Sequence, residues 1–135
     1  MTDANTLQVS LVEYFAPWVQ ALGLVVDAFD GNSVTLRLPH SEQLSRNGGL
    51  LCGQAMMAAA DTAMVLALIN HFGQFRPCAT VQMSSSFLKP LSNQDALVQA
   101  CVLRAGKAMA FGEIDIRGGT DGKSVCRVST TYALL

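Results

Sequence analysis

The longest run of strong helix formers in the chain reads GQAMMAAADTAMVLALINHF and covers residues 53–72. It contains no proline, and its only glycine is its first residue, so we expect one uninterrupted helix over Gly53–Phe72. Apolar side chains occur on nearly every face of this helix, which is typical of a helix buried on all sides. We therefore expect the rest of the chain to surround it, with Met56, Met57 and Met64 filling the core.

Asp61 is the one ionisable residue in this helix before its far end. A carboxylate among Ala, Met, Leu and Val is costly to bury unless it is hydrogen-bonded, paired or used in chemistry. Two interpretations are open. A shorter helix could begin at Asp61, because Asp followed by Thr is a good N-cap pair. Alternatively, Asp61 lies inside the helix and is catalytic, which the strong helix formers at residues 55–60 favour.

Length and composition indicate one domain over residues 1–135. Half of the residues are hydrophobic and only 14% are charged, so the chain either packs well or hides surface in an oligomer. A formal net charge of −1 gives no basic surface for nucleic acid. The longest uninterrupted apolar run, Ala63–Ile69, is too short to cross a bilayer, so we expect no membrane partner.

The N-terminal residues and the cysteines indicate a cytoplasmic protein. Residues 1–5 lack the basic start and apolar stretch of a signal peptide. The four cysteines are widely spaced without a CxxC pair, which suits reduced thiols better than a disulfide scaffold or a zinc site. The two histidines complete no ligand cluster with them, so we expect no metal and no other cofactor.

The segments on either side of the long helix predict an α+β domain. Before it, residues 7–23 predict an amphipathic helix that Pro17 kinks or divides, and residues 24–29 and 33–38 predict two strands. Residues 39–51 are polar and contain glycine, which is typical of a loop. After the helix we expect four strands, Cys78–Leu88, Ala96–Arg104, Ala108–Arg117 and Ser124–Leu134. Short turns between the last strands require antiparallel pairing, and one curved sheet could surround the helix.

This order of elements resembles the hotdog-fold acyl-CoA thioesterases, and most closely the phenylacetic-acid-degradation (PaaI-type) branch. The similarity runs from about Leu24 onward and rests on residues 52–61 and on TVQMSSSFLKP at residues 80–90. In that family the helix opens with His-Gly-Gly and carries an acidic residue where Asp61 stands, with Gly53 at the first glycine. The resemblance implies a hotdog fold, in which a curved antiparallel sheet wraps around one long buried helix, and hydrolysis of acyl-CoA thioesters.

The resemblance also implies roles for individual residues. The backbone N–H of Gly53 would polarise the thioester carbonyl at the helix N-terminus, where the helix dipole favours negative charge. Asp61 would activate water or attack directly. Thr80 stands where related enzymes carry a Ser or Thr bonded to the water or the carboxylate, although a strand threonine needs no function. Arg104 and Lys107 flank a turn that in relatives meets the phosphates of coenzyme A, although basic turn residues are usually just solvated.

The start of the helix departs from the family pattern. Cys52 replaces the usual histidine, and Gln54 replaces the second glycine. Upstream, Arg46 stands where relatives often carry Asn or Gln, with Asn47 beside it, and all four residues are candidates for substrate contact. Cys52 could also be an activated thiolate at a helix start. A Cys nucleophile normally needs a base, however, and the only candidates are His40 and His71. His71 lies roughly 28 Å away along a continuous helix, so a small, partly buried side chain fits Cys52 better.

We expect an acyl-CoA thioesterase, and two alternatives remain on the same fold. A hydratase or dehydratase would need a histidine beside the acid as general acid and base, and Cys52 stands where one would be. A non-catalytic acyl-CoA-binding protein would keep the pocket and the contacts to coenzyme A but would not need Asp61.

The spacing of Gly53 and Asp61 predicts a homodimer. Eight residues along one helix separate their backbones by roughly 12 Å. A bound carbonyl and the group that attacks it need close contact, roughly 3 Å. Two antiparallel helices from neighbouring chains would bring Gly53 of one chain to Asp61 of the other. Hotdog relatives are similar, because their sites lie across a two-fold interface and their dimers often pair again, so we expect a dimer of dimers.

Overall fold

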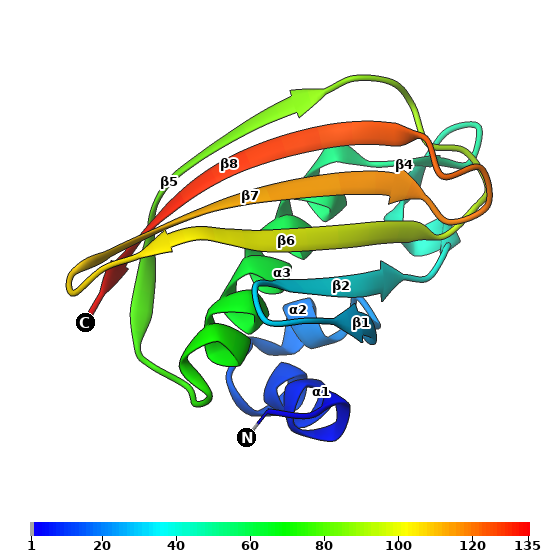
Figure 1. Cartoon of the computed structure of the whole chain (residues 1–135). Coiled ribbons are helices and arrows are strands. Elements are labelled where there is room, and N and C mark those ends of the chain that lie inside the picture. The colour runs from blue at the N-terminus through cyan, green and yellow to red at the C-terminus, as the bar shows by residue number, and fades with distance from the viewer. Residues whose placement is uncertain (1) are drawn as a thin grey trace.

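The computed structural model describes residues 2–135, in which a curved six-stranded sheet wraps around one long helix (Figure 1). This is the predicted α+β arrangement. The elements follow the chain as α1 (Ala4–Glu13), α2 (Pro17–Gln20), β1 (Val25–Phe29), β2 (Ser33–Leu38), the 3-10 turn η1 (Glu42–Leu44), β3 (Ser45–Arg46), β4 (Leu50–Leu51), α3 (Gly53–Phe72), β5 (Cys78–Phe87), β6 (Ala96–Ala105), β7 (Met109–Gly118) and β8 (Ser124–Leu134).

The sheet has the strand order β1-β2-β6-β7-β8-β5, and every neighbouring pair is antiparallel. β5 follows α3 in the chain but lies at the edge of the sheet, where its only strand partner in the described chain is β8. The register places Thr80 of β5 opposite Tyr132 of β8, and an irregularity between Thr80 and Gln82 follows directly. Residues far apart in sequence therefore meet on the concave face of the sheet.

The core lies between α3 and this concave face. Small side chains on α3, among them the fully buried Ala59, Ala60 and Ala63, let the helix approach the strands closely. Met64 occupies the space above Gly112 of β7, where an added Cβ would overlap the end of the methionine side chain. α3 is long and apolar enough to cross a membrane by length and composition alone, but most of it is buried here, so it is a core helix.

One side of α3 is uncovered in the single chain, which corrects the prediction of a helix buried on all sides. The uncovered stripe consists of residues at four-residue steps that are half-buried or exposed: Gly53, Gln54, Met57, Ala58, Asp61 and Val65. Met57, assigned to the core from the sequence, is 39% exposed, whereas Met56 and Met64 are buried. β5, beside this stripe, is also largely exposed.

Other differences from the predicted elements are local. Pro17 divides the predicted N-terminal helix in two. It is the first residue of α2, where the absence of a backbone N–H removes no helical hydrogen bond. Residues 39–51 are not a plain loop, since they hold η1 and the short β3–β4 hairpin. Gly48 and Gly49 in that hairpin turn both have positive φ, which glycine adopts without strain. The boundaries of the last four strands differ from the predicted ones by at most one residue.

Candidate active site

Asp61 lies in the middle of α3, so the interpretation of Asp61 as a helix N-cap is wrong. Its carboxylate points toward the sheet and is half-buried. The hydroxyl of Thr80 donates a hydrogen bond to Asp61 Oδ1 at 2.9 Å. The phenol of Tyr132 donates to the same oxygen at 2.5 Å and lies 3.2 Å from the backbone carbonyl oxygen of Asp61. The structure thus brings the predicted pair Asp61 and Thr80 together.

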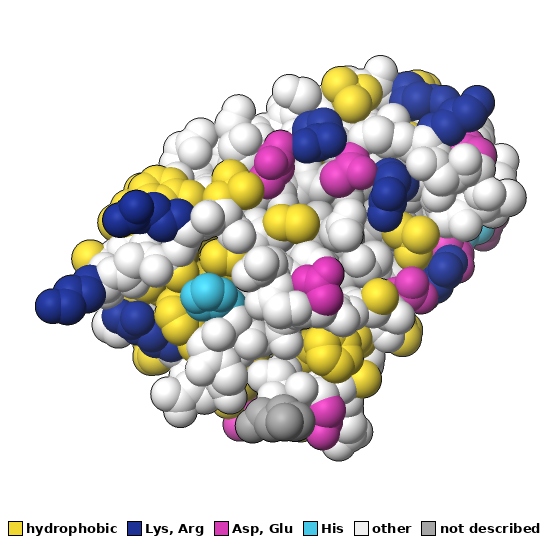
Figure 2. Space-filling model, in the orientation of Figure 1, with side chains coloured by type: hydrophobic (Ala, Val, Ile, Leu, Met, Phe, Trp, Pro, Cys, Tyr) yellow, Lys and Arg dark blue, Asp and Glu magenta, His cyan; other side chains and the backbone are white. Residues whose placement is uncertain are grey.

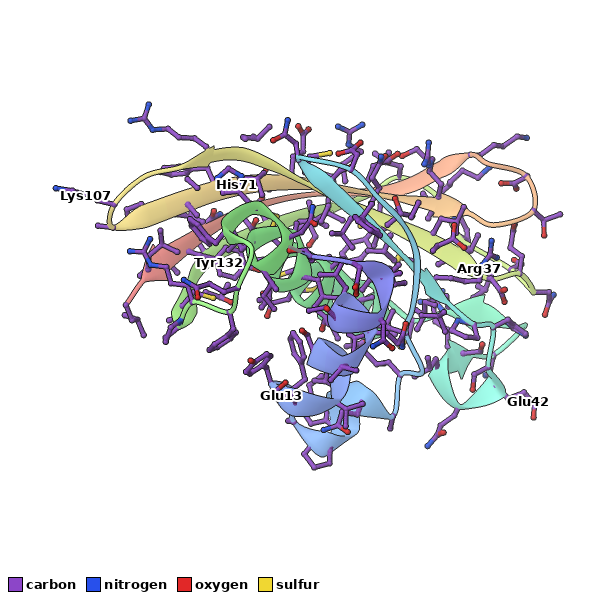
Figure 3. The ribbon with its side chains drawn as sticks, turned by 60° about the horizontal axis from the view of Figure 1, so that its bottom comes forward. Glu13, Arg37, Glu42, His71, Lys107 and Tyr132 are labelled. Atoms are coloured by element: carbon purple, nitrogen blue, oxygen red, sulfur yellow. The ribbon has the colours of Figure 1, made fainter. Side chains whose placement is uncertain are left out.

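Tyr132 is a site residue that the sequence reasoning missed. Its side chain is 0% exposed, and Figure 3 shows it under the sheet beside α3. Burial, and next the charge of Asp61, raise the pKa of the Tyr132 phenol, so it stays protonated and remains a donor. A signal was available: the buried face of β8 alternates through Val128, Thr130, Tyr132 and Leu134, and a buried tyrosine hydroxyl needs a partner.

Three of the four cysteines are unsuited to thiolate chemistry. Cys78 lies two residues before Thr80, and burial together with the charge of Asp61 raises the pKa of its thiol. Burial also raises the pKa of Cys101, and it raises the pKa of Cys126 to about 11. These thiols are therefore neutral near pH 7. Cys52 is the N-cap of α3 and is half-buried, and its side chain makes no capping hydrogen bond.

Gly53 lines a groove of about 440 Å³ at the N-terminus of α3. The ring of Phe87 covers this glycine, because a Cβ at Gly53 would lie 3.3 Å from Phe87 Cε1 and Cζ. Two cationic side chains, Arg46 and Lys89, belong to the same groove. The backbone N–H at the start of a helix and these cations make the groove suited to negative charge. The other lining residues are Leu50, Leu51, Met56, Leu88 and Pro90.

A second hollow, of about 350 Å³, also lies at the first turn of α3. Cys52, Gln54 and Ala55 form its α3 side. The remaining lining residues come from α2 and η1 and their flanks, and they are Trp18, Ala21, Leu22, Gln43 and Leu44. None of these side chains carries a formal charge, so the hollow suits an uncharged, apolar group.

The single chain does not bring Gly53 and Asp61 together. Both lie on the uncovered stripe of α3, but their backbones are roughly 12 Å apart along the helix axis. The groove at Gly53 does not include Asp61. Each chain therefore holds two separate halves of the predicted site: a carbonyl-binding end at Gly53 and a carboxylate with its hydroxyl donors near the helix middle.

The β6–β7 turn, which carries Lys107 and follows Arg104, lies at the opposite end of the molecule from the start of α3 (Figure 1). Arg76, just beyond the C-terminal end of α3, donates a hydrogen bond to the backbone oxygen of Lys107 at 2.7 Å. Basic side chains gather at this end in Figure 2, and Lys107 projects away from the body of the protein in Figure 3.

Asn47 lies exposed in the β3–β4 turn beside Arg46. Within residues 2–135 no cluster of acidic, histidine or cysteine side chains could hold a metal ion.

Residues 36–134 match the family model described as the acyl-CoA thioesterase N-terminal domain. The chain belongs to this family. It is therefore related to thioester hydrolases over most of its length, and the matched region contains Gly53, Asp61, Thr80 and Tyr132.

Individual thioesterases resemble this member of the family in sequence or in structure. A proposed esterase of Thermoplasma acidophilum is 26% identical over 100 residues, which is 74% of each chain. A proposed thioesterase of Silicibacter sp. TM1040 is 29% identical, with a TM-score of 0.89 over 100% of this chain and 93% of that one. Zebrafish thioesterase superfamily member 2 is 21% identical, with a TM-score of 0.88 over 100% of both chains, which shows the fold alone. The predicted hotdog fold is confirmed.

Proposed function

We propose that this thioesterase hydrolyses acyl-CoA thioesters to a free acid and coenzyme A, in sites shared between two chains. The observation that supports the proposal most is the Asp61 carboxylate, which an apolar helix carries on its uncovered side and two hydroxyl groups orient. The PaaI-type branch remains our expectation for its closest type, and the cytoplasm remains our expectation for its location.

In the proposed reaction, the Gly53 N–H of one chain hydrogen-bonds the thioester carbonyl oxygen and stabilises the negative charge that develops there. Asp61 of the other chain removes a proton from water as the water oxygen bonds to the carbonyl carbon. The C–S bond then breaks, and the proton passes to the sulfur of coenzyme A. In the alternative nucleophilic route, Asp61 itself attacks and the resulting acyl-aspartate is hydrolysed.

The uncovered surfaces support a homodimer as the working unit. The stripe on α3 and the exposed face of β5 lie side by side, and Val81 and Phe87 of β5 are 58% and 51% exposed. A two-fold pairing of these surfaces would set two α3 helices antiparallel and bury apolar area on both chains. It would also bring Gly53 of each chain toward Asp61 of its partner. Further pairing of dimers remains an expectation from the resemblance.

The lining of the two hollows suggests how the substrate lies. Coenzyme A is anionic, and the groove at Gly53 carries Arg46 and Lys89, with the exposed Asn47 adjoining Arg46. The uncharged hollow behind Cys52 and Gln54 suits the acyl group. Arg104 and Lys107 form a separate basic region. Each shared site contains Gly53 of one chain and Asp61 of the other. We propose that Arg104 and Lys107 of the chain that supplies Asp61 contact the phosphates of the coenzyme A bound there.

A hydratase or dehydratase is less well supported. His71 lies ten residues beyond Asp61 on α3, roughly 15 Å along the axis, and the backbone N–H of His40 bonds to Asp95. Within residues 2–135 the Asp61 side chain bonds to Thr80 and Tyr132 and to neither histidine.

The decisive variant is Asp61→Asn, which keeps the shape of the side chain and removes its charge. We expect kcat for acyl-CoA hydrolysis to fall by about two orders of magnitude or more, because the amide cannot act as a base. Rates should be measured with short, medium, long and aromatic acyl-CoAs, and circular dichroism and coenzyme A binding should remain as in the wild type. Turnover near the wild-type rate in this variant would rule out the role of Asp61.

A further inference from the structure

Both hydrogen bonds to the Asp61 carboxylate converge on one of its two oxygens. Oδ1 accepts the phenol proton of Tyr132 and the hydroxyl proton of Thr80, at 2.5 and 2.9 Å. No side chain or backbone group in residues 2–135 hydrogen-bonds to Oδ2. The two oxygens of this carboxylate are therefore inequivalent: Oδ1 is held by the protein, and Oδ2 is the one available to water or substrate.

Tyr132 is fixed much more firmly than an exposed donor would be. Its ring is completely buried in the core, and its strand β8 lies between β7 and β5, paired with both. The phenol oxygen also lies 3.2 Å from the backbone oxygen of Asp61, so it contacts both the main chain and the side chain of the same residue. Such a contact restricts the rotation of the Asp61 side chain on the helix.

We propose that Tyr132, together with Thr80, is a positioning residue that holds Oδ1 and thereby makes Oδ2 the reacting oxygen. The inference rests on the proposed hydrolysis and extends it. In the base route, Oδ2 takes the proton from water and returns it to the leaving sulfur. In the nucleophilic route, Oδ2 forms the bond to the acyl carbon. Throughout, Tyr132 keeps its own proton and only donates a hydrogen bond.

The surroundings of Asp61 make these two donors important for its charge. The groups that face it are Thr80 and Cys78 from β5 and Tyr132 from β8. The Cys78 thiol is neutral, because burial and the nearby carboxylate raise its pKa. No ion pair involves Asp61 in the described part of the chain. Removing one donor should therefore loosen the hold on Oδ1 and slow the chemical step.

The first test is Tyr132→Phe, which removes the phenol oxygen and keeps the buried ring. We expect kcat to fall by about tenfold, the effect of losing one hydrogen bond to a charged group. KM should stay unchanged, because Tyr132 is completely buried and lines neither hollow. The matched control is Thr130→Val, which deletes a hydroxyl on the same strand and face that is 3% exposed and makes no hydrogen bond. Its kcat should stay unchanged.

A second measurement avoids any loss of folding in the first variant. The chain has two tyrosines, so fluorotyrosine incorporated into a Tyr14→Phe background labels Tyr132 alone. Tyr14 stacks on Phe75 near the surface, and phenylalanine preserves that contact. The ¹⁹F resonance of this label reports the hydrogen bond to Asp61 itself, so we expect it to move in Asp61→Asn and to stay in place in Thr130→Val.

The outcomes separate this inference from the proposed function. If no acyl-CoA is hydrolysed, or if Asp61→Asn remains active, the proposed function fails and the inference fails with it. If wild-type enzyme is active and Asp61→Asn is not, a lower kcat with unchanged KM in Tyr132→Phe and a moved ¹⁹F resonance in Asp61→Asn support the positioning role. A ¹⁹F resonance that stays in place in Asp61→Asn, or a kcat that falls as far in Thr130→Val as in Tyr132→Phe, would overturn it.

Discussion

A carboxylate in the middle of an apolar helix persists in this protein because strands far away in sequence supply its hydrogen-bond donors. Thr80 reaches Asp61 from β5, and Tyr132 reaches it from β8. Each hydroxyl offsets part of the cost of removing the charge from water. The uncovered side of α3 leaves the carboxylate half-buried, so it keeps access to a water or to substrate.

Cys52 provides a further prediction at the scale of single residues. Because its side chain lines the uncharged hollow, Cys52→Ala should change KM and the preference among acyl chains, while kcat stays within about threefold of wild type. No acyl-enzyme should accumulate on the protein. Steady-state rates with several acyl-CoAs and intact-protein mass spectrometry would test this, and a covalent acyl group on Cys52 would indicate thiol catalysis instead.

At the scale of elements, the close approach of α3 to the sheet depends on a missing side chain. Gly112 of β7 leaves the space that the Met64 side chain occupies, and Met64 is fully buried. A strand glycine usually weakens a strand, and here it allows close packing of helix on sheet. The position of Asp61 relative to Thr80 follows from that packing, because Met64 lies less than one helical turn beyond Asp61 on the same helix.

Gly112→Ala should therefore destabilise the protein by about 1–3 kcal/mol, the usual cost of overpacking a core. The added methyl group would overlap the end of the Met64 side chain, which is fully buried and would have to shift within the core. Gly31→Ala is the matched control, because a Cβ there meets nothing within 4 Å and its φ is not in the left-handed range. Urea unfolding at one fixed protein concentration would measure both variants, and equal midpoints would contradict the packing argument.

Elements formed by local pattern were predictable, and those formed by long-range contacts were not. The composition of residues 53–72 was enough to place α3, and turn residues were enough to place the last four strands. Tyr132 escaped prediction because its bond to Asp61 spans 71 residues and depends on the register between β5 and β8. The uncovered stripe could not be predicted for a related reason. The sequence pattern of an all-apolar helix is the same whether strands or a second chain cover it.

At the scale of the whole molecule, the two halves of the site lie on one chain but too far apart to act together. The same surface carries both Gly53 and Asp61, so a two-fold pairing could complete two sites at once. The separated chains of such a dimer would have no activity. Its activity would depend on the concentration of protein, because dilution separates the halves.

Complementation between inactive variants tests the shared sites. Asp61→Ala removes the carboxylate, and Gly53→Pro removes the N–H donor at the first residue of α3, a position where proline is tolerated. The exposed ring of Phe87 must move by a few tenths of an ångström to accept the new Cβ. Each homodimer should be inactive. Heterodimers formed by co-expression should regain one site of the two, about half the wild-type rate per dimer.

The control for this experiment is a heterodimer in which one chain carries both substitutions and the other is wild type. It places one lesion in each shared site, so it should be inactive, whereas sites contained within single chains would leave it half-active. Folded heterodimers of the two single variants that show no activity would also contradict the shared-site arrangement.

The place of β5 at the sheet edge has a consequence for how the protein is made on the ribosome. β5 is synthesised directly after α3, but its strand partner β8 follows only after β6 and β7. Until then the nascent chain exposes a ten-residue strand with both edges unpaired, a segment prone to misassociation. The contacts among Asp61, Thr80 and Tyr132 therefore cannot form before β8 is synthesised, so the Asp61 carboxylate is oriented late in folding.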